Sequence, residues 1–557
     1  MPNIRSFLLI ALALVAFLLW QAWQTDYAAF KADTPAPVAE GSPAATVPGD
    51  AVPAPGEIPS ALPATGDAPA VATATATDEL PRITVETDLL RLAIDPRGGT
   101  LVGAELLAYP TSPREPAPVV LFNEEPGRYY VAQSGLVSGT GAAPDHRALY
   151  QATSTRHALG TAASLEVPLT WTGPDGLRVT KTYVFTRGSY VVGMRYAIEN
   201  PGAAPWSGSV YRQLQRTSPI VDRKFSFTNP EQYSFVGSAW YSPEERFEKL
   251  EFEDFAEEPL VRDITGGWSA MLQHYFFAAW LPPIAERNSY STEVITGNGA
   301  TRYLIRQVAA PVTIEAGGRS VLESRLYVGP KLQESLADVA PGLGATIDYG
   351  KVTVLAEPLF WLLNWIYKLL GNWGFAIIGL TVLIKLAFFK LSEAQYRSMA
   401  RMRKVQPRLA ALKERYGDDR QKMNQAMMEL YQKEKINPFG GCLPILVQIP
   451  VFIALYWVLI ESVELRHAPF IGWIHSLSER DPYFVLPVLN ALAMWAAQRL
   501  TPTPGMDPMQ QKVMQLMPIM FGVMFAFFPA GLVLYWTVNG VLGLLQQWVI
   551  MKRAGAT

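Results

Sequence analysis

The chain has 557 residues, a formal net charge of −2 at pH 7 and a single cysteine. Its length exceeds that of one domain, and its near-neutral charge excludes a globally basic nucleic-acid-binding protein. One cysteine excludes an intramolecular disulfide and any multi-cysteine metal site. Hydrophobic residues make up 49% of the chain, and charged residues are concentrated in particular stretches. This composition predicts a polytopic membrane protein with at least one soluble domain.

The chain begins with Arg5 and an apolar run that ends at Trp23, which fits either a signal peptide or an uncleaved anchor. Tryptophan is typical of membrane interfaces and no convincing cleavage site follows, so residues 1–24 are predicted to be an N-terminal transmembrane anchor. Residues 25–80 are rich in Ala, Pro and Thr and are almost free of positive charge. We expect them to form a disordered periplasmic linker.

From residue 81 to about residue 345 the sequence consists of short segments in which polar and apolar residues alternate. Clear examples are residues 82–87, 177–185 and 190–198. Period-two alternation with regular Gly and Pro turns predicts a large antiparallel β-sandwich, followed by a short terminal helix. The histidines of this region, His146, His157 and His274, show no metal-ligand spacing, and we interpret them as ordinary surface or core residues.

Beyond the β region the sequence becomes strongly apolar. The Trp-rich segment 358–370 is too short to cross a bilayer and is predicted to be an interfacial amphipathic helix. The longer apolar runs and the N-terminal anchor together predict six transmembrane helices. After the anchor, the predicted transmembrane helices are residues 374–391, 442–463, 482–500, 512–528 and 531–551.

The charge of the loops predicts the orientation of these helices. Residues 390–435 contain twelve Lys and Arg against six Asp and Glu, whereas the loop 464–481 has only two arginines. Basic loops stay in the cytoplasm, so the loop 464–481, the β domain and the linker are predicted to be periplasmic, and both termini cytoplasmic. The cytoplasmic segments are then a basic helical hairpin at 392–437, a loop at 501–511 and a tail at 552–557.

The basic hairpin is predicted to contain two helices, residues 391–415 and 421–435, with an Asp as the N-cap of the second. Its methionines suit adaptable binding of apolar segments, and its cations suit anionic headgroups or ribosomal RNA. The competing interpretation is a plain hairpin core with a solvated basic face. The candidate recruitment residues are Met399, Arg401, Met402, Arg403, Lys404, Met427 and Met428.

Lys385 lies in an otherwise apolar predicted span, with Thr381 one helical turn before it. A charge at mid-bilayer costs roughly 2.5–3.5 kcal/mol, so such residues usually face protein or water and have a function. The alternative is that Lys385 snorkels to the headgroups. Polar residues in other spans, such as Gln448 and Asn539, either hold helices together or line a wet cavity with Lys385. Because no nucleotide-binding, metalloprotease or nucleophile motif is present, we expect no enzymatic activity and no cofactor.

Seven segments carry a more specific signal: SEAQYRSMARM at 392–402, QP at 406–407, YGDD at 416–419, NPFGGCLP at 437–444, SVELR at 462–466, DPMQQK at 507–512 and GLVLYW at 531–536. Together they resemble the YidC/Oxa/Alb family of membrane protein insertases. The match is dense over residues 358–551, and the anchor with a large periplasmic domain resembles the Gram-negative type of this family.

The resemblance implies a five-helix core with a hydrophilic groove that is open to the cytoplasm and to lipid. The positive residue of that groove, usually Arg in the family, corresponds to Lys385, which keeps the charge but loses the planar fork of Arg. Thr381 corresponds to another groove residue, and Tyr535 and Trp536 correspond to an aromatic pair that contacts substrate. The β domain resembles a galactose-mutarotase-like supersandwich, for which no catalysis is implied.

We therefore interpret the chain as an inner-membrane insertase and chaperone that inserts and helps fold new membrane proteins, alone or with the Sec translocon. Its expected partners are nascent hydrophobic membrane proteins, the Sec translocon, the ribosome and membrane lipids, but no specific nucleic-acid sequence. The alternative is a membrane-anchored periplasmic carbohydrate-binding or carbohydrate-active protein, which would leave the C-terminal spans unexplained. A secondary transporter would require an inverted repeat, and the sequence contains none that we recognise.

Overall fold

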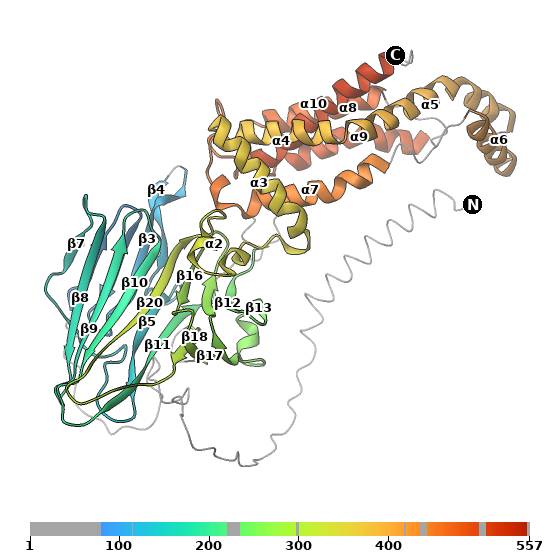
Figure 1. Cartoon of the computed structure of the whole chain (residues 1–557). Helices are drawn as coiled ribbons and strands as arrows, with labels where there is room; N and C mark the ends of the chain where they lie inside the picture. The colour runs from blue at the N-terminus through green and yellow to red at the C-terminus, as the bar shows by residue number, and fades with distance from the viewer. Residues whose placement is uncertain are drawn as a thin grey trace, which may run out of the picture. The chain divides into compact units, whose positions relative to one another are not determined.

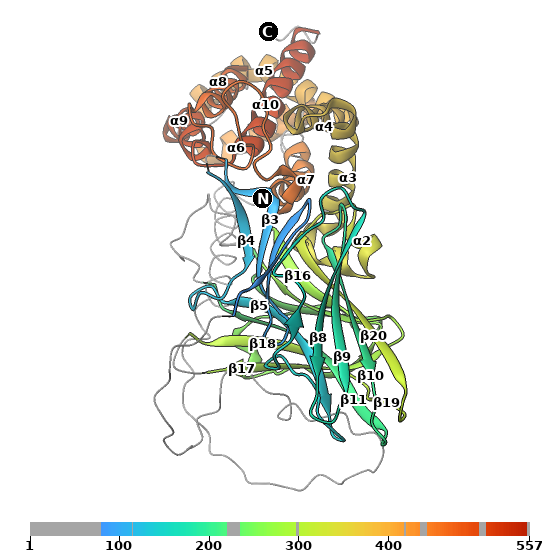
Figure 2. The same cartoon turned by 90° about the vertical axis from the view of Figure 1, so that its left-hand side faces the viewer.

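The structure is a computed structural model of the whole chain. It describes residues 80–113, 115–219, 234–296, 300–416, 419–434, 443–500 and 508–553. The predicted anchor and nearly all of the predicted linker lie outside these residues. The described chain forms a β domain and a helical region (Figures 1 and 2).

The β domain consists of two large sheets. In spatial order, the first contains β14 (Val261–Thr265), β17 (Arg287–Ile295), β18 (Arg302–Ala309), β11 (Trp206–Thr217), β5 (Tyr130–Ser138), β3 (Thr100–Ser112), β2 (Leu90–Asp95), β1 (Ile83–Glu86) and β7 (Arg156–Ala158), with β19 (Val312–Ile314) on β11 and β4 (Glu115–Phe122) on β3. The second contains β13 (Arg246–Leu250), β12 (Gly237–Ser242), β15 (Trp268–Leu272), β16 (Phe276–Leu281), β20 (Arg319–Pro330), β10 (Val191–Glu199), β9 (Arg178–Thr186), β8 (Ser164–Thr172) and β6 (Gln151–Ala152).

The prediction of a large β-sandwich is confirmed. Residues of β10 alternate between buried and partly exposed, as the period-two pattern requires. The sheets share one core, because the Tyr130 hydroxyl of β5 donates a 3.0 Å hydrogen bond to the Met271 carbonyl of β15. The indole of Trp280 in β16 likewise donates to the Gln213 carbonyl of β11 at 3.0 Å. The pairing departs from a purely antiparallel arrangement at one place, where β1 and β7 run parallel.

The described chain also contains helices, most of which follow the β domain in sequence. The helices are η4 (Glu253–Phe255), α2 (Leu336–Val339), η5 (Leu343–Thr346), η6 (Gly350–Val352), α3 (Thr353–Leu370), α4 (Trp373–Ala387), α5 (Phe389–Tyr416), α6 (Arg420–Lys433), α7 (Leu443–Glu461), η8 (Val463–Leu465), α8 (Val485–Leu500), α9 (Pro508–Phe525) and α10 (Ala530–Arg553). α3 begins before the predicted segment 358–370, because its buried stripe already starts at Ala356 and continues through Phe360 and Leu363.

The predicted span 374–391 is interrupted after Ala387. α5 begins at Phe389, and α4 and the first part of α5 differ in direction by 66°. The apolar sequence continues through this break, so hydropathy alone does not reveal it. Within the described ranges, no single helix is both long and apolar enough to cross a bilayer, whereas the bent pair α4–α5 meets the length and composition criteria together. The number of membrane spans therefore stays a prediction.

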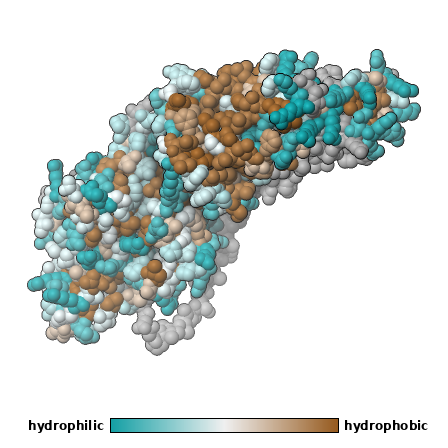
Figure 3. Space-filling model, turned by 45° about the horizontal axis from the view of Figure 1, so that its top comes forward, coloured by the Kyte–Doolittle hydropathy of each residue, from teal (hydrophilic) through white to brown (hydrophobic). Residues whose placement is uncertain are grey.

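Large apolar side chains cover much of the outer surface of the helical region (Figure 3). They include Phe375, Leu383, Leu386, Val488, Leu492, Trp495, Leu516, Ile519, Val523, Leu545 and Trp548 of α4, α8, α9 and α10. Soluble proteins rarely expose apolar patches larger than a few hundred Å². This surface is therefore suited to contact with lipid or with apolar partner segments.

Polar contacts connect the β domain to the segment that follows α7. The carboxylate of Glu464 accepts a 3.0 Å hydrogen bond from the backbone N–H of Gln333, and the Gln333 amide donates to the Ser462 hydroxyl at 2.9 Å. Arg466 donates to the carbonyl of Pro110 in β3 at 2.8 Å. Burial raises the pKa of Glu464 to about 7, because loss of solvent disfavours the charged carboxylate. Its second carboxyl oxygen has no hydrogen-bond partner among the described residues.

This carboxyl group predicts a pH dependence of stability. A folded-state pKa above the ordinary value means that the stabilisation is complete below about pH 4.5 and is lost as the pH rises through about 7. We expect Glu464→Gln to be more stable than the parent at pH 8, by about 3 kcal/mol, and equal to it near pH 4. Thermal unfolding at both pH values measures this difference. Glu479→Gln, at an exposed carboxylate of the same loop, is the matched control, and equal pH dependence in all three proteins would contradict the prediction.

Candidate functional site

Lys385 of α4 is half-buried and points at the backbone of α10. A Cβ atom placed on Gly543 would lie 3.4 Å from the Lys385 ammonium and 3.5 Å from the Tyr396 hydroxyl of α5. The missing side chain at position 543 thus leaves room for both groups. No charged partner of Lys385 is found among the residues that the structure describes. The ammonium therefore keeps its capacity to attract an anion.

One amide pair lies on the same side of α10. Gln448 of α7 donates a 3.0 Å hydrogen bond to the Asn539 side chain of α10. Asn539 precedes Gly543 by one helical turn, about 6 Å along the axis. Two of the polar residues that the sequence singled out are thus in direct contact, and a third, Lys385, lies one turn away on the same face.

Asn539 and Gly543 lie on one side of α10, which we call the polar stripe. The aromatic pair Tyr535 and Trp536 lies one turn before Asn539, at the other end of this stripe. Tyr535 is buried and stacks with Phe452 of α7 at 6.3 Å between ring centroids. Trp536 packs edge-to-face on the same Phe452 ring at 4.6 Å and contacts Phe525 of α9 at 4.7 Å. The indole N–H of Trp536 is buried and has no hydrogen-bond partner. It can serve an acceptor that enters between α7, α9 and α10.

Thr381 is placed differently from the other predicted groove residues. It is 1% exposed, and its hydroxyl donates a 2.7 Å hydrogen bond to the Ile377 carbonyl of its own helix. This bond satisfies the hydroxyl locally, as is common for Thr within helices. Its predicted role in a groove stays a prediction.

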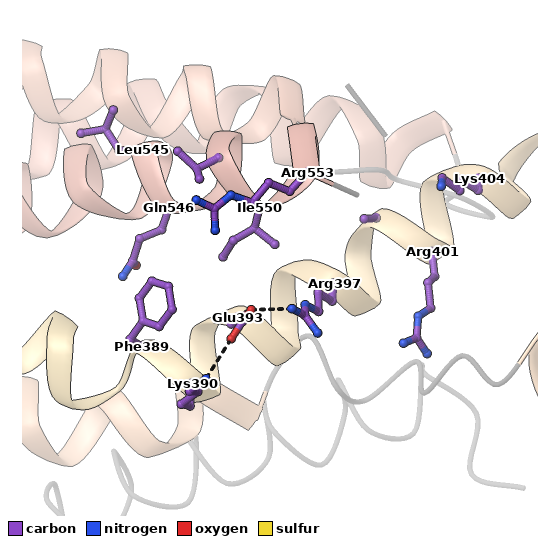
Figure 4. Close-up of a pocket in the computed structure, with 12 residues that line it drawn as sticks. Phe389, Lys390, Glu393, Arg397, Arg401, Lys404, Leu545, Gln546, Ile550 and Arg553 are labelled. Atoms are coloured by element: carbon purple, nitrogen blue, oxygen red, sulfur yellow. Dashed lines mark hydrogen bonds and ion pairs between the residues drawn. The ribbon is translucent and has the colours of Figure 1, made fainter. Parts of the chain in front are cut away.

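A cavity of about 790 Å³ lies beyond the Lys385 end of the stripe, between α5 and the last turns of α10 (Figure 4). Phe389, Leu545 and Ile550 provide apolar surface, and the Gln546 side chain points toward Phe389 across the opening. The side-chain oxygen of Gln546 is buried without a partner. The lining therefore combines an apolar floor with an unused polar group.

Most of the charged groups around this cavity are cations. They are Lys390, Arg397, Arg401 and Lys404 of α5 and Arg553 of α10. The acidic group of the lining, Glu393, pairs with Arg397 at 2.6 Å and lies 3.8 Å from Lys390 (Figure 4). The remaining positive charge favours anionic ligands.

The structure separates the seven candidate recruitment residues. Arg401 and Lys404 line the cationic cavity. Met402, Met427 and Met428 instead pack on the core of the α5–α6 hairpin, which is formed by Val405, Leu409 and Tyr431. Met399 is half-buried on α5, and one guanidinium nitrogen of Arg403 is buried without a partner. Residue Asp419 caps α6 by accepting the Lys422 N–H at 3.1 Å.

The β-domain histidines occupy separate environments. His146 contacts the Tyr211 hydroxyl at 2.6 Å, and burial lowers its pKa to about 4. Burial lowers the pKa of His274 to about 3, while the half-buried His157 ring contacts the Ser154 carbonyl at 3.1 Å. Over the described ranges, no group of three or more His, Cys, Asp or Glu side chains is arranged to hold a metal ion.

The sequence did not indicate that Gly543 and Tyr396 lie beside Lys385. It also did not indicate that Lys390 and Arg397, on the first turns of α5, line the cavity. One signal was available, because a Gly inside an apolar helix often marks a close approach of another group. Gly543 lies one turn after Asn539, on the face that was already recognised as polar. The neighbourhood of Tyr396 and Lys385 depends on the bend between α4 and α5, which the sequence did not indicate.

Two family models match the chain. Residues 82–362 match the YidC periplasmic domain, and residues 365–556 match the 60Kd inner membrane protein. The first match covers the β domain together with most of α3, and the second covers the helices that carry Lys385 and the cationic cavity.

Curated relatives match over the whole length. A membrane protein insertase YidC from Thioalkalivibrio sulfidiphilus is 50% identical over 99% of this chain and 99% of its own. A protein of the same name from Stenotrophomonas maltophilia is 48% identical over 100% of this chain and 97% of its own. A solved structure of an active YidC insertase with its first transmembrane domain resolved is 17% identical, covers 84% of this chain and 92% of its own, and has a TM-score of 0.38.

Proposed function

This chain belongs to the YidC family of membrane protein insertases, and from this premise we propose how its helical region inserts a substrate. Its function is the insertion of membrane proteins, its substrates are membrane proteins, and its β domain is the periplasmic domain of the family. The carbohydrate-related alternative is not favoured, because relatives that match along the whole chain carry the insertase name.

We place the helical region in the inner membrane, with α3 along the periplasmic surface and α4, α7, α8, α9 and α10 across the bilayer. The N-terminal anchor is the sixth span, both termini are cytoplasmic, and the basic α5–α6 hairpin lies in the cytoplasm. The apolar outer surface of α4, α8, α9 and α10 supports this placement. The excess of cations on the hairpin supports the orientation.

The substrate path is the polar side of α10, which we call the groove. It runs from the Tyr535–Trp536 pair past the Gln448–Asn539 amide pair to Lys385, and it ends at the cationic cavity. The observation that carries this proposal is the Lys385 ammonium against Gly543, with no charged partner in the part of the chain that the structure describes. A cation in a partly wet cavity attracts the acidic tail of a substrate and shortens the distance that polar groups travel through hydrocarbon.

Insertion of this kind needs no bond to be made or broken, so the proposal assigns no catalytic group and no cofactor. A substrate span of about 20 apolar residues, each contributing roughly −0.3 to −0.6 kcal/mol, gains about 6–12 kcal/mol on entering the bilayer. The slow step is the transfer of the polar flank. The groove lowers that barrier, and the apolar span then leaves sideways into lipid.

Further partners follow from the cytoplasmic face. The cations of α5 suit the ribosome and anionic lipid headgroups, and we propose that the hairpin holds nascent chains near the groove. We propose that substrates with long periplasmic segments also need the Sec translocon. A groove that is open on one side only is too short to transfer such segments.

A reconstituted system tests the function directly. The purified full chain is placed in liposomes, and a newly synthesised single-span protein with an acidic N-terminal tail is added. We expect protection of the span from external protease in these vesicles and little in vesicles without the chain. Equal protection in both would refute insertion by this protein alone. Depletion in cells then identifies the substrates that need the Sec translocon as well.

Gly543 offers a geometric test of the groove. Gly543→Ala adds only a Cβ at ordinary contact distance from Lys385 and Tyr396, so we expect near-normal insertion. Gly543→Leu must displace one of these groups, and overpacking of this kind costs about 1–3 kcal/mol. We expect it to slow insertion of the acidic-tailed substrate about fivefold or more. Full activity of the Leu variant in the protease-protection assay would show that this space is not used.

A further inference from the structure

A second cavity, of about 330 Å³, lies in the β domain far in sequence from the helices that form the groove. It is bordered by β4, by the start of β5 and by the end of β11. Arg216 of β11 and Gln273 provide polar groups, and Val120, Leu121 and Tyr130 provide apolar and aromatic surface. Arg128 adds a second guanidinium on an exposed loop.

Arg216 is buried, with 5% of its surface exposed, although it lines this cavity. One of its nitrogens donates to the Gln273 side-chain oxygen at 3.3 Å, and its guanidinium lies 4.6 Å from the centre of the Tyr130 ring. Its Nε and Nη1 groups have no hydrogen-bond partner. Leaving N–H groups of a buried charge unpaired is costly, typically by several kcal/mol per ion.

The other buried arginines of the sandwich differ in this respect. Arg212 is fully buried and pairs with Glu286 at 2.7 Å, and Arg306 approaches Glu293 at 3.5 Å. The fold thus supplies carboxylates to neighbouring buried guanidinium groups but supplies none to Arg216 within the part of the chain that the structure describes. Burial lowers the pKa of Arg216, and no carboxylate charge opposes that shift.

Among the residues that the structure describes, none of those lining the cavity is acidic. Glu124 follows the lining residue Asn123 in sequence, but its carboxylate pairs with Arg82. An anion that entered the cavity would therefore meet two cations, an amide and no opposing negative charge. A single buried guanidinium is balanced best by a singly charged, planar acceptor.

We propose that this cavity binds the carboxylate of a ligand whose hydrocarbon or aromatic body rests on Tyr130 and the apolar lining. The carboxylate pairs with the Arg216 guanidinium, whose unpartnered Nε and Nη1 groups are themselves buried and turn toward the cavity when the ligand enters. Gln273 holds the remaining nitrogen of the guanidinium. The site is independent of the insertion groove, and its ligand comes from the periplasmic side. The carboxylate is carried either by an acidic peptide or by a small acidic sugar.

Saturation-transfer NMR on the full chain in lipid nanodiscs tests this with paired probes. N-acetylphenylalanine and glucuronate carry the carboxylate, and N-acetylphenylalaninamide and glucose are their neutral counterparts. We expect at least one acid to bind at least about tenfold more tightly than its neutral counterpart. Preference for N-acetylphenylalanine assigns a peptide carboxylate, and preference for glucuronate assigns a sugar. Failure of both acids to bind, or equal binding of the neutral probes, overturns the proposal.

Variants link binding to the named residue. Arg216→Gln is expected to weaken binding of the acid about tenfold or more, whereas Arg302→Gln, which removes a similar Arg–Tyr contact outside the cavity lining, leaves it unchanged. Without ligand, Arg216→Met is expected to raise Tm, because it removes an unpaired buried charge. Should Arg216→Gln fold poorly, Val120→Trp narrows the cavity from an exposed position and must also abolish binding. Unchanged binding in either cavity variant would refute the site.

Discussion

Replacing Lys385 by Glu is expected to abolish insertion of substrates with acidic translocated tails, while Lys385→Arg remains active. In the structure the Lys385 ammonium faces Gly543 and has no charged partner in the described chain. Two unit charges 4 Å apart interact by about 4 kcal/mol at an effective dielectric constant near 20. Charge reversal turns this attraction into repulsion, which is enough to slow transfer by several orders of magnitude. Lys385→Ala removes only the attraction and should fall between these variants.

Substrates with short neutral tails are the internal control for this series, because their insertion depends on hydrophobic gain and not on charge capture. Lys351→Glu is the matched variant that should leave insertion unchanged, since it makes the same charge change on an exposed side chain outside the groove and the cationic cavity. Snorkelling predicts the opposite order, with Lys385→Ala harmless or stabilising. Protease protection measures insertion of an acidic-tailed substrate by Lys385→Ala. If its rate equals that of the parent protein, Lys385 does not attract substrate in the groove.

Much of the β domain could be predicted from local pattern. The alternation at 190–198 anticipates β10, because a strand buried on one face must alternate with period two. What the sequence did not indicate is pairing between distant strands. The parallel contact of β1 with β7 and the pairing of β10 with β20 are set by the packing of whole sheets, which no short window of sequence contains.

In the candidate site, too, single residues could be predicted from the sequence, whereas their arrangement in space could not. Lys385, Gln448 and Asn539 could be found individually, because each is polar within an apolar run and is costly to bury without a reason. Their grouping depends on how the three helices α4, α7 and α10 pack. Thr381 shows the limit of the approach, since its hydroxyl bonds to its own helix. Gly543 was overlooked because its contribution is empty space, which no motif encodes.

Removing the distal part of the basic hairpin is expected to abolish insertion in cells while the remaining helices still fold. A deletion of residues 403–433, closed by a short Gly-Ser linker, removes Arg403, Lys404 and the Val405–Leu409–Tyr431 core. It keeps Tyr396 beside Lys385, and it keeps Ala400 packed on Met551 of α10. The deletion keeps the approach of Lys385 to Gly543 but removes Lys404 from the cationic cavity, so the loss tests recruitment by the hairpin together with that cation.

The matched control inserts the same linker between Gly417 and Asp418, at the predicted turn, and leaves both hairpin helices intact. Thermal unfolding of the purified deletion variant should stay within a few degrees of the parent, because the deleted part forms its own small hydrophobic cluster. If the deletion variant supports growth and inserts the acidic-tailed substrate at the parental rate, the hairpin is a solvated appendage. A second variant keeps the full-length hairpin and changes both Arg401 and Lys404 to Gln. If this variant fails to insert the substrate while the deletion variant succeeds, substrates need the cationic cavity and not the rest of the hairpin.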